Sequence, residues 1–373
     1  MTPPSPPPET SVVDAGCRIQ EELGELLAYL PEKKAPTKFR EYARSRGPGT
    51  PRANVYAGPS AFPLAAYKDA AGGEKPVVDS SIVETVDAAE LDARRQSYGV
   101  DDCVVNPTEN LGLAEVNNDR YAVALARGYN DWLCDQLDGH DALYGNALVA
   151  PQAPDRAAEE IDRVGAERDV VGIHLPCTGL TPFAGHHSYA PIYEAAQRHD
   201  LPITMFPTVG LRAYHQQYYS SQWFAEDYTY HPSFNHIQQI TSLLFEGVPV
   251  RFPDIEFVVL GAGLGFGPYL SQRLDDHYLE LGYEIPALEK LPSKYLDERF
   301  YWGTAPIGNE YARGEYLPRM IRMVGVENVL YTSDLPHRRG DSPGACFDRI
   351  EAAFDGEELA RLFGGNARSL FGL

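Results

Sequence analysis

Eight short apolar runs alternate with amphipathic stretches or long connections along this chain. Two of these runs lie early, at residues 11–14 and 102–106, and six lie later, at 144–150, 170–175, 202–206, 256–261, 300–304 and 329–334. Stretches with apolar residues at helical spacing follow several of them, at 155–168, 189–199 and 234–246. Short strands that alternate with helices are typical of a parallel sheet, and eight such units predict an α/β protein with a closed (β/α)₈ TIM barrel.

The length of 373 residues is suited to one such barrel with insertions. Residues 1–10 contain five prolines, which predicts a disordered leader before a barrel spanning 11–373. Two stretches exceed the minimal barrel: a Pro-, Gly- and charge-rich excursion at 32–85 and an aromatic loop inserted at 208–232. A connection this long inside a compact domain is usually functional.

Charge and composition exclude several classes of function. The net charge of −21 argues against binding to nucleic acid or to an anionic membrane surface, because both require clustered Lys and Arg. No run of about 18 apolar residues exists to span a membrane, and residues 1–10 lack the pattern of a signal peptide. The five cysteines are widely spaced without a CxxC pair, which suits a reducing cytoplasm and excludes a zinc ribbon.

Several segments resemble the amidohydrolase-related family, which includes aminocarboxymuconate-semialdehyde decarboxylase and related hydrolases and decarboxylases. The segments are residues 129–133 (YNDWL), 189–196 (YAPIYEAA), 242–253 (SLLFEGVPVRFP), 333–337 (SDLPH) and 364–368 (GGNAR). The resemblance implies a barrel whose strand ends hold one divalent metal. It places two ligands at alternate positions of the first strand, a His on the fifth strand and an Asp at the end of the eighth. In this family, a His or Glu on the sixth strand often assists the chemistry.

Carried onto this sequence, most of these positions hold residues that cannot bind a metal. The first-strand pair falls on Gly16 and Arg18, the fifth-strand position on Phe206 and the sixth-strand position on Gly261. Asp334 alone is retained. No shift of register restores the first-strand pair, because residues 1–139 contain no histidine. Because a catalytic zinc normally takes three protein ligands, the pattern predicts that the family's metal site is lost.

Two interpretations of the altered site remain open. In the first, Arg18 replaces the charge of the metal by pairing with Asp334, or by binding the carboxylate or phosphate of a ligand. In the second, His174 and Asp334 form a new metal site with one of three histidines, at positions 215, 231 and 236. A His between two apolar residues is more often a hydrogen-bonded core residue than a ligand.

Other residues near the expected strand ends complete the predicted site. Asp334 and His337, three residues apart, can form an acid/base pair, and Cys177 follows the fourth strand. The aromatic loop, including Trp223, is a candidate for an oligomer interface, a lid over the barrel or a self-packed loop. We therefore predict Asp334, His337 and Arg18 as catalytic residues. Six predicted pocket residues are Gly16, His174, Cys177, Phe206, Gly261 and Trp223.

The favoured hypothesis is a degenerate amidohydrolase without its own cofactor, acting as accessory subunit in a homo- or hetero-oligomer with an active sibling amidohydrolase. The alternative is a metal-independent or atypical-metal hydrolase or lyase, resembling the decarboxylases, for a small aromatic or carboxylated molecule. It allows one divalent metal such as zinc. A sensor that binds such a molecule without turnover is a third possibility.

Overall fold

The eight predicted strands form one parallel sheet in sequence order. The computed structural model describes residues 11–21, 23–30, 87–116, 118–207, 224–307, 315–335 and 341–373. Each strand pairs in parallel with the next from β1 to β8. The strands are β1 (Val13–Arg18), β2 (Asp102–Asn106), β3 (Leu143–Leu148), β4 (Val170–His174), β5 (Ile203–Met205), β6 (Phe257–Val259), β7 (Phe300–Gly303) and β8 (Val329–Leu330).

Backbone hydrogen bonds continue from β1 to the residues that follow β8. Ala15 N donates to Tyr331 O at 3.1 Å, and Arg18 N donates to Leu335 O at 2.8 Å. Side chains of the first and last strands also share one hydrophobic cluster, which contains Val13 of β1, Leu330 of β8 and Val258 of β6. The sheet therefore closes on itself, and the predicted barrel is confirmed.

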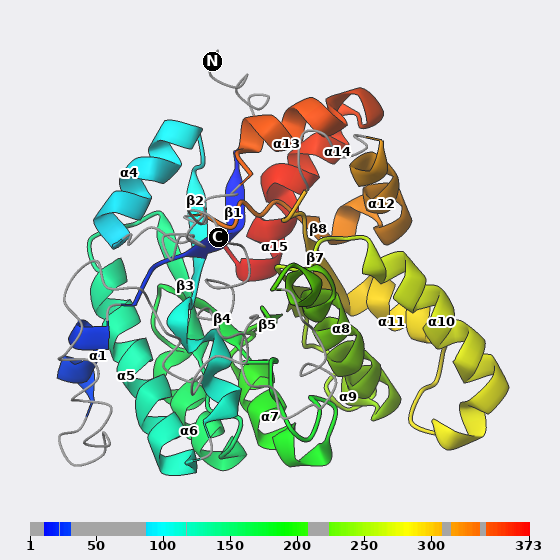
Figure 1. Ribbon diagram of the computed structural model, residues 1–373, viewed down its shortest axis with the longest axis horizontal. Helices are drawn as coiled ribbons and strands as arrows, with labels where there is room; N and C mark the ends of the chain where they lie inside the picture. The colour runs from blue at the N-terminus through cyan, green and yellow to red at the C-terminus, as the bar shows by residue number, and fades with distance from the viewer. Residues whose placement is uncertain are drawn as a thin grey trace, which may run out of the picture.

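Helices surround this barrel (Figure 1). The longer ones are α4 (Ala88–Tyr98), α5 (Asp119–Leu137), α6 (Pro154–Val164), α7 (Ala190–Arg198), α8 (Phe224–Phe245), α10 (Phe266–Leu281), α11 (Pro292–Arg299), α12 (Tyr316–Val324) and α13 (Pro343–Ile350). Shorter ones are α1 (Leu23–Tyr29), α9 (Val248–Arg251), α14 (Gly356–Ala360) and α15 (Asn366–Phe371), and the 3₁₀ turn η2 (Glu109–Glu115) follows β2. Among the described helices, none is both long and apolar enough to cross a membrane.

Alternate residues along each strand belong to two different hydrophobic layers, one inside the barrel and one between the sheet and the helices. On β2, Val104 lies in the barrel interior, whereas its neighbours Cys103 and Val105 belong to the core between sheet and helices. On β6, Val258 is likewise inside, between two outward-facing residues. This alternation follows from the two-residue period of a strand. It explains why the runs are mostly apolar, since both faces of each strand are buried.

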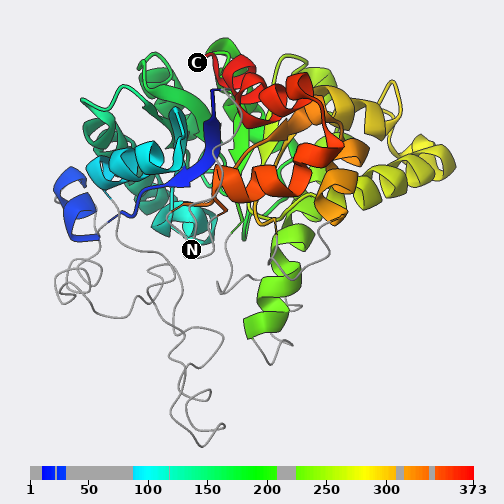
Figure 2. The same ribbon diagram turned by 90° about the horizontal axis from the view of Figure 1, so that it is seen from above.

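The inserted segments depart from the sequence-based prediction at one boundary. The leader 1–10, the excursion 32–85 and residues 208–223 of the aromatic loop lie outside the described residues. Residues 224–232, predicted as loop, instead form the start of α8, which contains Pro232 and projects beyond the body of the protein in Figure 2. The polar and aromatic composition of this stretch hid its helical character.

A layer of polar side chains crosses the barrel interior. Asn146 Nδ2 donates to Asn106 Oδ1 at 2.8 Å and to Thr204 Oγ1 at 3.2 Å, and all three residues are fully buried. Asn106 Nδ2 in turn donates to the backbone oxygen of Ala15 at 3.2 Å. The layer thus ties four strands together directly beneath the ends of the strands.

We expect Asn146→Ala to lower the free energy of unfolding by about 1–3 kcal/mol, because it leaves buried polar atoms of Asn106 and Thr204 without their hydrogen-bond donor. Thr204→Val, nearly the same shape, should cost less, because Asn146 keeps its bond to Asn106. Urea unfolding of both variants measures the difference. A cost below about 0.5 kcal/mol for Asn146→Ala, the range of a neutral surface change, would contradict the role of this layer.

Candidate functional site

The buried carboxylate of Asp14 joins β1 to the segment after β8. Its Oδ1 accepts hydrogen bonds from Gly16 N at 2.9 Å and from Ser333 N at 3.0 Å. Burial raises the pKa of Asp14, while the bonds from Ser333, Cys17 and Gly16 favour the ionised form. Because Ser333 directly precedes Asp334, this carboxylate fixes the position at which the last strand delivers Asp334 to the C-terminal end of the barrel, here called the mouth.

Arg18 and Asp334 form an ion pair at the mouth, as the first interpretation of the sequence required. Arg18 Nε donates to Asp334 Oδ1 at 2.8 Å, and Nη2 bonds the same oxygen. The Arg18 residue is 8% exposed, so much of this pair is removed from water. Asp334 adopts a left-handed backbone conformation with φ of 61°, which is uncommon for a residue other than glycine. Such a conformation at a strand end is frequent in functional sites.

Phe206 and Gly261 complete the surroundings of Arg18. The guanidinium carbon of Arg18 lies 4.5 Å from the centroid of the Phe206 ring, within range of a cation–π interaction. Gly261 has φ of +73°, and a Cβ there would lie 2.2 Å from the Phe206 ring. Glycine is therefore required for the ring to stand where it does. Four positions predicted from the family pattern thus meet at one place.

Gly16 is also held by packing. A Cβ at this position would lie 2.7 Å from Cβ of Thr332, in the segment that follows β8. The close approach of β1 to this segment leaves no space for a side chain at residue 16. The strand bulges between Asp14 and Cys17, so the simple alternation assumed from the sequence does not hold there.

His174 ends β4 in register with Thr204 and is fully buried. Both of its ring nitrogens lack a hydrogen-bond partner among the described residues. Burial lowers the pKa of His174 to about 3, so the imidazole is neutral near pH 7. A neutral imidazole is the form that binds metals.

The second interpretation, a relocated metal site, is not assembled among the described residues. His236 lies on α8, where Nε2 contacts Leu260 O at 2.8 Å, and His231 is buried on the same helix. In the described part of the chain, only Asp14, Cys17 and Cys103 form a group of three potential ligands with all donor atoms within 4.8 Å of one another. His215 lies outside the described residues.

The remaining predicted residues are less informative. Cys177 is fully buried, and burial raises the pKa of its thiol to about 12, which does not suit a nucleophile. Its backbone oxygen accepts from Asn235 and Gln239 of α8, so the segment after β4 anchors that helix. His337 and Trp223 lie outside the described residues, and their roles remain predictions.

Glu115 was missed by the sequence-based reasoning. It ends the turn after β2, and its Cγ lies 2.5 Å from the position that a Cβ on Gly179, after β4, would occupy. It therefore sits between two connections on the mouth side of the barrel. Burial raises the pKa of Glu115 to about 8, so the carboxyl is mostly protonated near pH 7. Its place in the connection that follows the second strand was the available signal, and the sequence analysis did not consider this connection.

With this geometry in place, comparison with known proteins identifies the family. The family model described as Amidohydrolase matches residues 64–373. The chain belongs to the amidohydrolase family. The comparison with curated proteins found no match.

Solved structures similar to this amidohydrolase include decarboxylases of aromatic acids. The 5-carboxyvanillate decarboxylase from Sphingomonas paucimobilis is 22% identical with a TM-score of 0.68, over 98% of this chain and 99% of that one. The 5-carboxyvanillate decarboxylase from Novosphingobium aromaticivorans is 17% identical with a TM-score of 0.69, and the match covers 98% of this chain and 97% of that one. A dihydroxybenzoic acid decarboxylase from Polaromonas sp. JS666 is 18% identical with a TM-score of 0.65, and the match covers 98% of this chain and 97% of that one. At these identities the likeness establishes the fold.

The expectation of no cofactor is contradicted by this comparison. The Novosphingobium and Polaromonas decarboxylases both contain bound manganese, which points to a divalent metal. The expectation rested on the residues that replace the family's ligands, and the alternative that allowed one divalent metal is the one that the comparison supports.

The described mouth residues of this amidohydrolase do not by themselves fit such an ion. Asp334 offers a carboxylate, but its Oδ1 is bonded to the Arg18 guanidinium, a cation that cannot ligate a metal. His174 offers a neutral imidazole, yet the two residues belong to no group of three close donors in the described ranges. A ligand set at the mouth would need residues beyond these.

We expect Glu115→Gln to flatten the pH dependence of stability. A carboxyl whose pKa rises from 4.5 to about 8 on folding stabilises the folded state fully below pH 4.5, and this contribution is lost as pH rises towards 8. The wild-type free energy of unfolding should therefore fall across this window, by at most about 1.4 kcal/mol per pH unit from this group.

Chemical denaturation of the wild type and of Glu115→Gln at pH 5, 6.5 and 8 measures this difference. Exposed Glu159→Gln is the matched control and should leave the wild-type slope unchanged. Equal slopes for wild type and Glu115→Gln would show that Glu115 ionises normally in the folded state.

Proposed function

We propose that this amidohydrolase is a lyase that removes the carboxyl group of a small aromatic carboxylate bound by Arg18. The observation that carries this proposal is the Arg18 guanidinium at the mouth, paired with Asp334 and lying against the Phe206 ring. The names of the similar solved structures, decarboxylases of substituted benzoates, support the same substrate class.

Arg18 has the chemistry to bind the carboxylate of a substrate. A guanidinium carries five N–H donors, and Asp334 engages two of its nitrogens. A second carboxylate can therefore approach the same cation and receive paired hydrogen bonds. The adjacent Phe206 ring offers an apolar face for an aromatic ring, and burial of Arg18 strengthens its interaction with an anion.

Decarboxylation requires a proton donor close to the bound ring. The bond between ring carbon and carboxyl carbon breaks, carbon dioxide leaves, and the electron pair left on the ring carbon takes up a proton. Glu115, which carries a proton near pH 7, is the candidate donor on the mouth side. Asp334 and His337, the acid/base pair proposed from the sequence, are the alternative donors.

The other predicted pocket residues enter the proposal through packing. Gly16 allows the close approach of the segment after β8, and Gly261 allows that of Phe206. His174 supplies an uncharged polar group beneath the site. Cys177 anchors α8, and Trp223 is proposed to line the substrate. The manganese of the similar decarboxylases points to a divalent metal, for which the described mouth residues supply no ligand set. The proposed carboxylate binding and proton transfer use only this chain's own side chains.

We expect Arg18→Ala to weaken binding of 2,6-dihydroxybenzoate or 5-carboxyvanillate by at least about 10-fold, equivalent to roughly 1.4 kcal/mol. Carbon dioxide release should fall with it. Arg18→Lys keeps the charge but loses the planar fork, so it should recover only part of the binding. Calorimetric titration and a carbon dioxide assay measure both quantities.

Arg163→Ala on α6, which removes an ion pair with Glu160, is the matched control for loss of an arginine. It should bind and turn over the same molecules as the wild type. Unchanged binding and turnover in Arg18→Ala would refute the proposed role of Arg18.

The second candidate is an accessory subunit of an oligomer, partnered with a second copy or an active sibling amidohydrolase in a reducing cytoplasm. Two observations favour it: the described mouth residues lack a metal ligand set, and large apolar side chains are exposed on α10 and α12. Tyr269 is 59% exposed, Leu279 is 74% exposed and Met323 is 70% exposed. Exposed apolar area of this kind often marks interfaces.

For an accessory subunit, we expect the purified chain to be inactive alone and to form a stable complex when co-expressed with a sibling amidohydrolase. Charged substitutions Leu279→Glu and Met323→Glu should dissociate that complex. Light scattering after size-exclusion chromatography gives the mass. A monomer that releases carbon dioxide unaided would rule this candidate out in favour of the lyase.

A further inference from the structure

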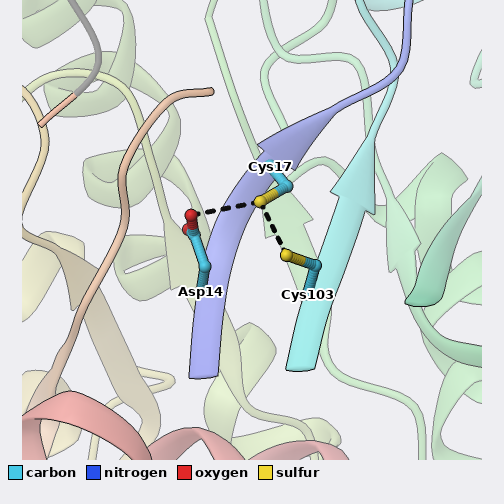
Figure 3. Close-up of side chains that lie close together, drawn as sticks. All are labelled: Asp14, Cys17 and Cys103. Atoms are coloured by element: carbon cyan, nitrogen blue, oxygen red, sulfur yellow. Dashed lines mark hydrogen bonds between the residues drawn. The ribbon is translucent and has the colours of Figure 1, made fainter. Parts of the chain in front are cut away.

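Three potential metal ligands converge on the outer face of β1 and β2, away from the residues discussed at the mouth. Figure 3 shows Asp14 and Cys17 on β1 and Cys103 on the neighbouring strand with their side chains turned towards one another. Cys17 Sγ lies 3.1 Å from Asp14 Oδ2 and 3.1 Å from Cys103 Sγ. All three residues are 0% exposed.

The convergence depends on the irregularity in β1. Asp14 pairs with Cys103, and Cys17 pairs with Val105, so three steps along β1 match two along β2. In a regular strand, residues 14 and 17 would point to opposite faces. The extra residue of the bulge brings both to one face beside Cys103. Bulges of this kind often redirect a side chain at a functional position.

The carboxylate of Asp14 is already oriented as a ligand would be. Its Oδ1 is engaged by the backbone amides of Gly16 and Ser333, while Oδ2 faces the Cys17 thiol. Carboxylates that ligate metals are typically held by such outer hydrogen bonds. Two sulfur atoms and one carboxylate oxygen form a donor set that suits thiophilic cations such as Zn²⁺.

We propose that Asp14, Cys17 and Cys103 supply three ligands to one thiophilic divalent cation of the zinc class behind the mouth, with a water molecule as the fourth ligand. Zn–S bonds of about 2.3 Å in a tetrahedral site separate two sulfurs by roughly 3.7 Å, so the thiols need to part by about half an ångström. Binding displaces the thiol protons to solvent and leaves two thiolates and one carboxylate around the ion. This site does not rest on the proposed lyase function.

The ion would fasten β1 to β2 directly behind Arg18 and, through Asp14, to the segment that carries Asp334. Because the group is fully buried, the cation enters during folding and exchanges slowly afterwards. The experiment therefore supplies the metal during expression of the full chain.

The test is expression in medium supplemented with Co²⁺, followed by elemental analysis and near-ultraviolet absorption. Wild type should retain about one equivalent with thiolate-to-cobalt charge-transfer bands, and Cys17→Ser and Cys103→Ser should each retain under about a tenth of that. Cys346→Ser, which removes another fully buried free thiol, is the matched control and should bind as wild type.

X-ray absorption spectroscopy of the wild type, expressed in medium that contains zinc, tests the proposed ligands without any variant. Two sulfur ligands to zinc are expected. A wild type without bound cobalt or zinc, a bound ion without sulfur ligands, or full retention in folded Cys103→Ser would each overturn the proposal. Loss of carboxylate binding in Arg18→Ala is a separate readout, so the two proposals can fail independently.

Discussion

The arrangement of this amidohydrolase depends on how the barrel closes between its first and last strands. β8 is short, and the closure relies on backbone bonds from β1 to residues 331 and 335 and on the buried Asp14 carboxylate that holds Ser333. Burying a carboxyl group in the core is costly unless it is fully hydrogen-bonded. That cost makes the geometry specific, because only one placement of the segment after β8 satisfies Asp14. Arg18, on one side of this seam, and Asp334, on the other, meet as a consequence.

The Arg18–Asp334 pair gives the mouth a chemistry different from a set of neutral imidazoles. A guanidinium supplies fixed positive charge and directional donors, but no lone pair for a cation. The site is thus suited to binding an anion directly. The Novosphingobium decarboxylase, which has the same fold, holds manganese together with a substituted benzoic acid. In the described part of this chain, the group of three close potential metal ligands lies instead on β1 and β2.

The sequence predicted the barrel well because its signal is local and repeated. Each strand is a short, mostly apolar run that is followed by a helix or connection, so eight units were visible without tertiary information. The family resemblance then placed Arg18, Phe206, Gly261 and Asp334 at strand ends, and the structure brings them together. The start of α8 was missed because aromatic and polar residues around Pro232 give no clear helical period.

The finer parts of the site depend on information that no single strand carries. The bulge in β1 arises from its pairing with β2, so Asp14 and Cys17 could not be placed on one face from their spacing. The altered pKa of Glu115 depends on burial beside Gly179, which is distant in sequence. The inference of no cofactor from the replaced ligands was wrong, because decarboxylases of the same fold contain bound manganese and point to a divalent metal.

The most direct test is a crystal structure of the protein, purified without chelator and grown with 2,6-dihydroxybenzoate, with anomalous data collected at metal edges. We expect the carboxylate of the ligand on the Arg18 guanidinium, and an anomalous peak between Asp14, Cys17 and Cys103. A metal peak at the mouth, coordinated by Asp334 with Arg18 displaced from it, would contradict the proposed roles of Arg18 and Asp334.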